Sequence, residues 1–281
     1  MTVAQSLGAA IARLNAAGIP DAPRDARILV AHALGIGSDR LTLALHEEIP
    51  AAAEAALAAA LARRESREPV SHITGTRLFW GRVFHVNSDV LDPRPETEGL
   101  IAASLDAPFQ HVLDLGTGSG AIVLSLLAEC PDARGLGVDL SLAALDIARG
   151  NARTLGLQDR VAFSRSDWFE AVKGKYDLIV SNPPYLAETE IAGLSPEVRL
   201  HEPRMALTPG GDGLDAYRIL SARAPRFLTP QGRLVMELGP TQATDVLTMM
   251  TEAGFTRLET RRDFDGRNRV VMGLWPGHAT G

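Results

Sequence analysis

The run Asn182-Pro183-Pro184-Tyr185 places a side-chain amide, two prolines and an aromatic ring directly after the apolar segment 176–180. Valine, isoleucine and leucine in a short run predict a buried strand, and two prolines prevent it from continuing as a strand or a helix. Because proline biases the residue before it toward extended backbone, we expect Asn182 to be held stiffly where the strand ends.

Hydrogen-bond acceptors held in this way suit a planar –NH2 group. The Asn182 side-chain oxygen and a proline carbonyl can hold both of its hydrogens, while Tyr185 offers an aromatic face for packing. An amide or aromatic amine is a poor nucleophile because its lone pair is delocalised. Favouring a pyramidal nitrogen as a bond to carbon forms therefore stabilises the transition state. A turn that only ends the strand is the alternative that the tetrapeptide alone leaves open.

A second motif is a glycine-rich loop between the predicted strand 111–115 and a predicted helix. Glycines let the backbone approach a ligand, and the helix N-terminus presents unpaired N–H groups to it. With Ala121 as its last position the pattern also fits the dinucleotide fingerprint, so it does not separate NAD from other nucleotide-type ligands. A purely structural turn is the other alternative. The loop residues are Gly116, Thr117, Gly118, Ser119 and Gly120.

Asp139 ends the next predicted strand, about twenty residues beyond the glycine loop, where a carboxylate can bond both ribose hydroxyls of a cofactor. The run Ser166-Asp167-Trp168 follows the third strand and could frame an adenine ring, although Trp168 also fits a core position. Hydride transfer needs a proton donor of suitable pKa, which residues 182–185 do not supply. These residues therefore favour S-adenosylmethionine over NAD.

The motifs all lie where strand and helix signals alternate along the chain. Such alternation predicts an α/β fold with a mainly parallel, doubly wound sheet that binds ligands at the carboxyl ends of its strands. Asn182 stands at the end of the fourth strand, where a ligand site is expected. The seven predicted strands are 111–115, 135–139, 161–164, 176–180, 232–238, 257–261 and 269–274.

The first part of the chain, residues 1–70, shows only helical periodicity and predicts a bundle of four helices. Its eight acidic and seven basic residues argue against a nucleic-acid arm. A structural cap and a docking module for a protein partner both fit. Residues 71–98, with a β-hairpin pattern at 77–86 and a proline-stiffened loop, predict a linker to a catalytic domain at 99–281.

Composition limits the classes of function. The chain has 281 residues and a net charge of −6, which is the wrong sign for a protein that mainly binds the phosphate backbone of nucleic acids. Its one cysteine, Cys130, permits neither a disulfide framework nor a thiolate cluster, and the seven histidines lack paired metal spacing, so we predict no metal. Because no signal-type or membrane-spanning apolar run is present, we expect a cytoplasmic location.

The motifs occur in the order found in S-adenosylmethionine-dependent amino-methyltransferases. Over essentially its whole length the chain resembles the HemK/PrmC-type release factor glutamine methyltransferases. The resemblance implies a seven-stranded Rossmann-like methyltransferase sheet, a small N-terminal helical bundle and a linking β-hairpin. Beyond the glycine loop, Asp139, Ser166-Asp167-Trp168 and residues 182–185, it is carried by the segments 93–98, 201–207, 211–215 and 262–271.

The resemblance also implies a reaction. A methyl group passes from S-adenosylmethionine to the side-chain amide nitrogen, N(5), of the glutamine in the Gly-Gly-Gln motif of class-1 peptide chain release factors, leaving S-adenosylhomocysteine. The glycine loop, Asp139, Trp168 and Asn182 would contact the cofactor. Residues 182–185 would hold the substrate glutamine, with Asn182, Pro183 and Tyr185 as catalytic residues. Residues 1–70 would dock the release factor, and the long segment 186–212 would form part of the wall around it.

Three other functions fit parts of the sequence. A DNA or RNA methyltransferase acting on an exocyclic amine needs the same acceptors, but also an extruded base and a basic surface. The acidic net charge and the absence of an added recognition domain disfavour it. Residues 182–185 disfavour an NAD-dependent dehydrogenase, and an intact Asn182 disfavours a non-catalytic S-adenosylmethionine-binding scaffold that only docks a translation factor.

Overall fold

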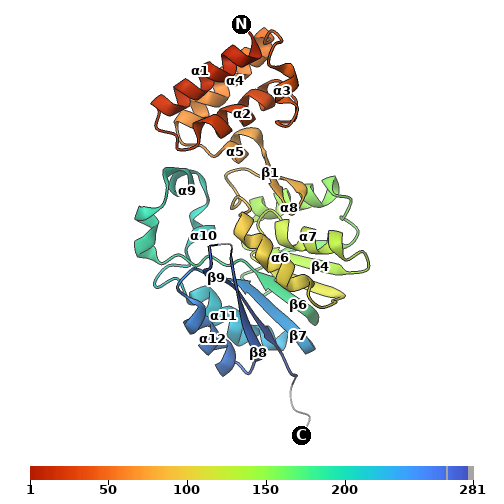
Figure 1. The fold of residues 1–281 in the computed structure, drawn as a ribbon. Coiled ribbons are helices and arrows are strands. Elements are labelled where there is room, and N and C mark those ends of the chain that lie inside the picture. The colour runs from red at the N-terminus through yellow and green to blue at the C-terminus, as the bar shows by residue number, and fades with distance from the viewer. Residues whose placement is uncertain (264, 278–281) are drawn as a thin grey trace. The chain divides into compact units, whose positions relative to one another are not determined.

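The computed structural model describes residues 1–263 and 265–277 (Figure 1). The chain divides into two compact units. The helical unit comprises Met1–Thr76 together with Leu194–His201, and the sheet unit comprises Arg77–Gly193 and Glu202–Gly281. A short segment from the second half of the chain therefore belongs to the helical unit, which the sequence pattern did not indicate.

Apolar residues at helical spacing build the helical unit. Its first helix begins at a capping box, in which Thr2 Oγ1 accepts from the Gln5 backbone N–H and Gln5 Oε1 accepts from that of Thr2. Leu14 and Leu29 are fully buried in its core. The helices are α1 (Val3–Ala16), α2 (Ala22–Ala33), α3 (Leu41–Ala44), α4 (Ala51–Glu65), α5 (Val70–Thr74) and α9 (Pro196–His201).

A buried arginine attaches α9 to the rest of the helical unit. Arg64 Nε lies 2.7 Å from Asp25 Oδ2, and its Nη1 lies 3.0 Å from Glu197 Oε1 of α9. His201 Nε2, at the end of α9, lies 3.1 Å from the Ser66 carbonyl oxygen. The Arg64 side chain is only 7% exposed, so loss of either carboxylate leaves a buried charge poorly paired.

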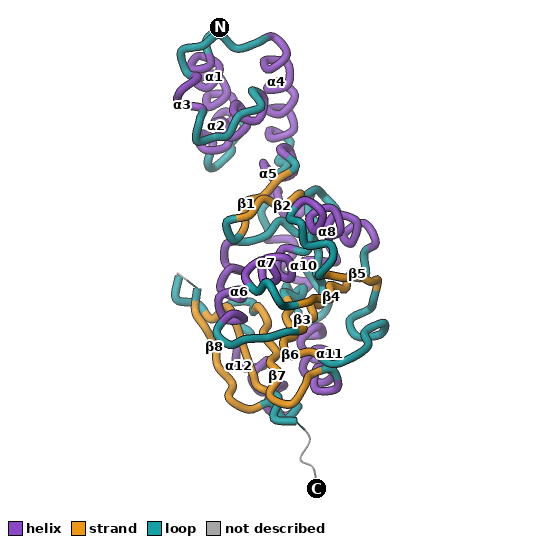
Figure 2. The backbone as a smooth tube through the Cα atoms, turned by 90° about the vertical axis from the view of Figure 1, so that its right-hand side faces the viewer, coloured by secondary structure: helices purple, strands orange, loops and turns teal. Residues whose placement is uncertain are grey.

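The sheet unit is built on a seven-stranded sheet in the order β5-β4-β3-β6-β7-β9-β8 (Figure 2). Neighbours from β5 to β7 are parallel, whereas β9 runs antiparallel to both β7 and β8. The predicted mainly parallel, seven-stranded sheet is confirmed. The strands are β3 (His111–Leu115), β4 (Arg134–Asp139), β5 (Val161–Arg165), β6 (Tyr176–Ser181), β7 (Leu228–Glu237), β8 (Thr256–Arg262) and β9 (Asn268–Leu274).

Apolar residues cover both faces of the sheet, which explains why its central strands are continuous hydrophobic runs. Adjacent residues of β3 point to opposite faces, so that Val112 and Leu113 belong to different core clusters. The Val112 face packs against α6 (Glu98–Leu105), α7 (Ala121–Glu129) and α8 (Leu142–Thr154). The Leu113 face packs against α11 (Asp215–Arg223) and α12 (Ala243–Glu252) (Figure 1). The sheet is therefore doubly wound.

The predicted hairpin consists of β1 (Thr76–Phe79) and β2 (Arg82–His85). Trp80 and Gly81 between them both have positive φ, 47° and 68°, the backbone geometry of a tight hairpin turn. Asn151 of α8 holds this hairpin, because its side chain accepts from the His85 N–H at 2.8 Å and donates to the His85 carbonyl at 3.1 Å.

The segment 186–212 holds only short helical turns, in agreement with its weak regular-structure signals. They are the 3-10 helix η2 (Glu188–Gly193), α9 and α10 (Arg204–Leu207), while two further 3-10 turns, η1 (Pro95–Thr97) and η3 (Ala224–Arg226), lie elsewhere. No helix within residues 1–263 and 265–277 combines the length and the apolar character needed to cross a membrane.

Candidate active site

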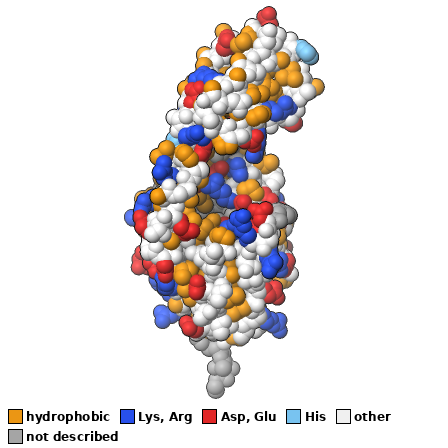
Figure 3. Space-filling model, turned by 60° about the vertical axis from the view of Figure 1, so that its left-hand side comes forward, with side chains coloured by type: hydrophobic (Ala, Val, Ile, Leu, Met, Phe, Trp, Pro, Cys, Tyr) orange, Lys and Arg blue, Asp and Glu red, His pale blue; other side chains and the backbone are white. Residues whose placement is uncertain are grey.

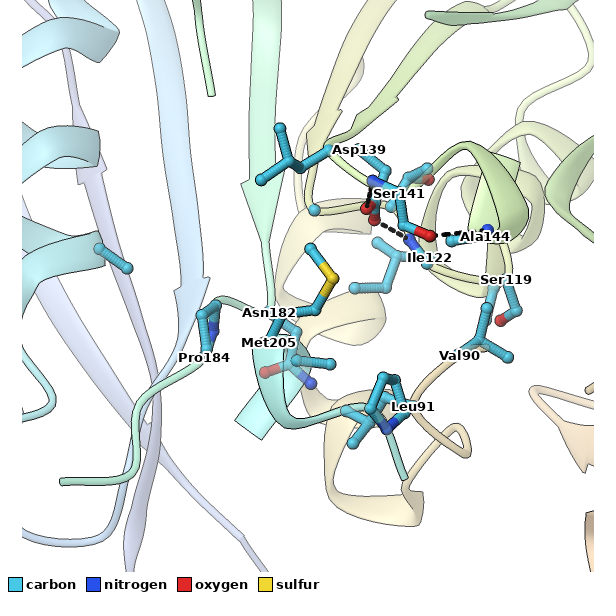
Figure 4. A pocket seen from close by; sticks show the side chains of 18 of the residues that line it. Val90, Leu91, Ser119, Ile122, Asp139, Ser141, Ala144, Asn182, Pro184 and Met205 are labelled. Atoms are coloured by element: carbon cyan, nitrogen blue, oxygen red, sulfur yellow. Dashed lines mark hydrogen bonds between the residues drawn. The ribbon is translucent and has the colours of Figure 1, made fainter. Parts of the chain in front are cut away.

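A cavity of about 500 Å³ opens at the carboxyl ends of β3, β4 and β6, where the sequence predicted a ligand site. This volume suits a ligand of nucleotide size. Asp139 and Ser119 reach it from the glycine-loop side, while Asn182 and Met205 reach it from the segments that follow β6 (Figure 4). Residues predicted from separate motifs therefore share one cavity.

The glycine loop is held by a buried carboxylate that the sequence analysis did not single out. Asp114 Oδ2 accepts from the Thr117 hydroxyl at 2.7 Å and from the Val123 N–H of α7 at 3.3 Å. Burial raises the pKa of Asp114 to about 7. Gly116 and Gly118 have φ of 72° and 53°, a backbone region that glycine enters without steric cost. Asp114 therefore joins strand, loop and helix, and glycines give the loop its positive φ angles without steric cost.

The Asp139 carboxylate is oriented by two backbone N–H groups. Its Oδ2 accepts from Gly118 at 2.9 Å, and its Oδ1 accepts from Ser141 at 2.9 Å (Figure 4). Ser141 in turn begins α8, where its hydroxyl oxygen accepts from the Ala144 N–H. Each carboxylate oxygen has capacity for a further hydrogen bond. Asp139 can therefore accept from two adjacent hydroxyl groups of a ligand in the cavity.

Trp168 lies in a strained turn at the cavity wall, with φ of 48°. The Ser166 hydroxyl stabilises this turn, because it donates to the Trp168 carbonyl at 2.8 Å and accepts from the Ala171 N–H at 2.9 Å. A Cβ placed on Gly116 would come within 4.0 Å of the Trp168 ring. Ser166 thus holds the turn that places the indole beside the glycine loop, and the adenine contact expected of residues 166–168, all of which line the cavity, stays a prediction.

Asn182 follows directly on β6, and its Nδ2 donates to Thr97 Oγ1 at 3.2 Å. Within the described ranges no residue donates to its Oδ1, which leaves that oxygen available to a ligand. Pro183 is buried, and the Tyr185 carbonyl accepts from Gln242 Nε2 at 2.8 Å. Burial raises the pKa of Tyr185 to about 12, so its phenol stays neutral at physiological pH.

Comparisons with known proteins support the resemblance. The family model of the PrmC N-terminal domain matches residues 5–75, and that of the methyltransferase small domain matches residues 95–214. A release factor glutamine methyltransferase of Cereibacter sphaeroides is 54% identical over 98% of this chain and 99% of its own length. The chain belongs to the release factor glutamine methyltransferases. The family predicted from the sequence motifs is therefore confirmed.

Other members of the family are similarly close. The release factor glutamine methyltransferase of Rhodospirillum rubrum is 46% identical over 92% of this chain and 81% of its own length. The release factor glutamine methyltransferase of Caulobacter vibrioides is 43% identical over 98% of this chain and 96% of its own length. The similarity thus includes both the helical and the sheet unit.

Solved structures at lower identity share the fold. A methyltransferase from Pyrococcus furiosus has a TM-score of 0.53 at 16% identity, covering 69% of this chain and 88% of its own. The hMettl16 catalytic domain has a TM-score of 0.58, also at 16% identity, and the match covers 77% of this chain and 82% of that domain. These likenesses establish a methyltransferase fold for this member of the family, and say nothing of its substrate.

Most of the residues that we predicted to contact the cofactor or the substrate line the cavity of this release factor glutamine methyltransferase. Gly120, Pro183 and Tyr185 do not line it. Gly120, with φ of 79°, begins α7, and a Cβ there would come within 3.0 Å of Leu124. Its place is therefore in the packing of the loop on α7. The predicted residues on the cavity wall are Gly116, Thr117, Gly118, Ser119, Asp139, Trp168, Asn182 and Pro184.

Two segments that carried the family resemblance meet at the cavity wall. Arg94 Nη2 lies 2.6 and 2.7 Å from the two carboxylate oxygens of Glu202. The Glu202 side chain is 1% exposed, and burial raises its pKa to about 6 although Arg94 opposes the shift. The sequence analysis placed the segment of Glu202 at the wall of the site but did not pair it with Arg94, because no local pattern links positions so far apart.

Proposed function

We propose that this protein transfers the methyl group of S-adenosylmethionine to the side-chain amide nitrogen of the glutamine in the Gly-Gly-Gln motif of class-1 peptide chain release factors. The observation that carries the proposal is that Asn182, with an available Oδ1, lines the same cavity as the oriented carboxylate of Asp139. One residue suits the amide to be methylated and the other suits the cofactor. S-Adenosylhomocysteine is the second product.

The cofactor fits the donors and acceptors on the cavity wall. The Asp139 oxygens suit the two ribose hydroxyls, the glycine-loop backbone suits close approach of the ligand, and the Trp168 ring suits an apolar contact. S-Adenosylmethionine, when bound, supplies a methyl group on a positively charged sulfur that leaves as a neutral thioether. The cavity volume of about 500 Å³ is large enough for such a ligand.

The residues after β6 act on the substrate amide. Asn182 Oδ1 accepts one of its N–H bonds, and the carbonyl oxygen of Pro183, a buried residue between cavity-lining Asn182 and Pro184, is proposed to accept the other. This orients the nitrogen and favours its pyramidal form as the new bond to carbon develops. Although Tyr185 does not line the cavity, its neutral ring is proposed to pack beside the amide when the substrate is bound. After transfer the nitrogen is acidic enough to release one proton to solvent or to a backbone acceptor, so the reaction requires no side-chain base.

The helical unit is proposed to dock the release factor. Leu194–His201 belongs to this unit, and the chain on either side of it leads to residues of the sheet unit, including cavity-lining Pro203 and Met205. The chain that belongs to the helical unit therefore continues directly into residues that line the cavity. We expect the reaction in the cytoplasm, together with its protein substrate.

Transfer to a nucleic-acid base is the rival function. It would require a basic surface along the strand. On the face shown in Figure 3, acidic and basic side chains are mixed over the surface. Together with the net charge of −6, this supports a protein substrate.

The experiment is a methylation assay with S-adenosylmethionine and an unmethylated release factor. Peptide mass spectrometry is expected to find one added methyl group on the Gly-Gly-Gln peptide. A release factor with alanine in place of that glutamine serves as the matched control and should gain none. Transfer to DNA or RNA, with no transfer to the release factor, would replace the proposal by the rival function.

A further inference from the structure

Three side chains from distant parts of the sheet unit form a hydrogen-bonded row that ends at Asn182. Asn182 Nδ2 lies 3.2 Å from Thr97 Oγ1, and Thr97 Oγ1 lies 2.5 Å from Glu237 Oε2. Thr97 immediately precedes α6, while Glu237 is the last residue of β7. Thr97 and Glu237 are 4% and 1% exposed, so their side chains are largely shielded from water, although Thr97 and Asn182 line the cavity.

The row has only one consistent direction when Glu237 is ionised. A carboxylate only accepts hydrogen bonds, and the Thr97 hydroxyl has a single proton, which it donates to Glu237. The Thr97 oxygen must then accept from its other neighbour. Only the amide nitrogen of Asn182 can donate to it. If the amide turned by half a revolution, Oδ1 would face the lone pairs of Thr97, and Nδ2 would take the place of the acceptor.

We propose that Thr97 and Glu237 are positioning residues that determine which end of the Asn182 amide is presented to the substrate. The inference rests on the proposed role of Asn182 as an acceptor for the substrate amide. Thr97 and Glu237 do not touch the reacting atoms. They act by keeping Oδ1 as the exposed end, because a flipped Asn182 would present two N–H donors to a substrate –NH2 group that also donates.

Thr97 departs from the local rule for its position. Threonine before a helix usually accepts a hydrogen bond from the first turn. In the structure Thr97 occupies the N-cap position of α6, but its side chain makes no capping bond. Its hydroxyl is directed to Glu237 and Asn182 instead. A threonine at this position therefore does not serve as a side-chain cap in this protein.

The buried side chain of Glu237 also lowers local stability. A buried carboxylate is costly, and an apolar residue of similar size would fill the end of β7 at lower cost. The Tyr217 hydroxyl holds its backbone by donating to the Glu237 carbonyl at 2.9 Å. Burial raises the pKa of Glu237 to about 7, while the Thr97 hydrogen bond and the positive charges of Arg269 and Arg94 oppose that shift and favour the ionised carboxylate. Residues that are unfavourable for local stability are expected where the function of a site requires them, and Thr97 and Glu237 are two such residues beside the cavity.

The test compares Thr97→Val with Thr97→Ser in the full-length protein. Valine keeps the shape but removes the hydroxyl, whereas serine restores it. We expect Thr97→Val to lower kcat for release factor methylation about 10-fold, equivalent to roughly 1.4 kcal/mol of transition-state stabilisation. The Kd for S-adenosylmethionine should stay within about twofold of the wild-type value, and Thr97→Ser should recover most of the turnover.

Glu237→Gln provides a second, independent variant. Glutamine can still accept from Thr97 through its oxygen, but it can also turn and donate, so it fixes the direction of the row less strictly. Its kcat should lie between those of the wild type and Thr97→Val. Thr248→Val, the same chemical change at an exposed threonine of α12, is the matched control and should leave kcat unchanged.

The outcomes separate this inference from the proposed function. Suppose that Asn182→Ala loses turnover while Thr97→Val and Glu237→Gln both keep wild-type kcat. This outcome would overturn the positioning role and leave the role of Asn182 intact. Asn182→Ala with wild-type turnover would remove the premise and overturn both. Should Thr97→Val fail to fold, the kcat of Glu237→Gln decides, and a wild-type value contradicts the inference.

Discussion

The Ser181 hydroxyl donates a 2.7 Å hydrogen bond to the carbonyl oxygen of Leu115. Leu115 is the last residue of β3, from which the glycine loop departs, and Ser181 is the last residue of β6, which leads into Asn182. The two strands pair in parallel as far as Asp114 and Val180. The Ser181 bond extends their connection by one residue and ties the two halves of the site together at the cavity edge.

Ser181→Ala should therefore affect stability and turnover together. It leaves the buried Leu115 carbonyl without this donor, which is expected to lower the free energy of unfolding by about 1–3 kcal/mol. Denaturant unfolding and kcat for release factor methylation provide the measurements. Ser88→Ala, at an exposed serine, is the control. An unfolding free energy equal to that of the control would show that the Ser181 bond contributes nothing.

Asn182→Ala should separate catalysis from cofactor binding. Removal of Oδ1 takes away an acceptor that we expect to act most strongly in the transition state, so kcat should fall by about 100-fold or more. Calorimetric titration with S-adenosylmethionine should give a Kd within a few-fold of wild type. A parallel loss of both quantities would mean that Asn182 is chiefly a cofactor contact.

Asp139→Ala should show the opposite pattern. Loss of the two acceptors predicted to bond ribose hydroxyls should weaken S-adenosylmethionine binding by about 10- to 100-fold. The release factor KM, measured at saturating cofactor, should change little. Asp146→Ala removes an exposed carboxylate of α8, 76% exposed, and should leave the cofactor Kd unchanged. Equal cofactor affinity in the two variants would rule out Asp139 as the ribose ligand.

The buried Glu237 carboxyl should make stability depend on pH. Burial raises its pKa from 4.5 to about 7, with the Thr97 hydrogen bond and the charge of Arg269 opposing the shift. Between these values the folded protein holds a proton that the unfolded chain has lost, so the free energy of unfolding falls as the pH rises from 4.5 to 7.

Glu237→Gln removes this titration, while Asp114 titrates alike in both proteins. The stability of the wild type relative to Glu237→Gln should therefore decline by on the order of 3 kcal/mol across the pH window. Denaturant unfolding at several pH values provides the comparison. A difference that stays constant from pH 4.5 to 7 would show that the Glu237 pKa is not raised.

Deletion of residues 1–70 should raise the KM for whole release factor if the helical unit docks the substrate. The deletion also removes Arg64, the partner of Glu197 in α9, and so changes the segment that leads to the cavity wall. Glu197→Gln isolates that second effect, because it weakens the attachment of α9 and leaves the helices in place. A KM raised by the deletion and unchanged in Glu197→Gln would assign docking to the helices. Unchanged kinetics in both would leave the unit as a structural cap.

Local patterns were enough to predict much of the sheet unit. Apolar runs flanked by glycine and proline predicted the strands, because burial on both faces demands continuous hydrophobic residues. The glycine loop, Asp139 and Asn182 were recognisable since each directly follows a strand, and parallel strands bring their carboxyl ends to one edge. The prediction of a shared cavity needed no knowledge of side-chain contacts.

The contacts that hold these residues were decided only by the tertiary structure. Thr97 and Glu237 are 140 positions apart, and Arg94 and Glu202 are 108 apart, so no periodicity relates either pair. In the sequence, Asp114 is one polar residue within an apolar run, and Thr97 follows a proline-rich loop, so neither position indicates the partner of its side chain. Hydrogen-bond partners across the fold depend on how α6 packs against β7 of the sheet. Strand positions and chemical motifs are local properties of the sequence, whereas the direction of the Asn182 amide is a property of the folded chain.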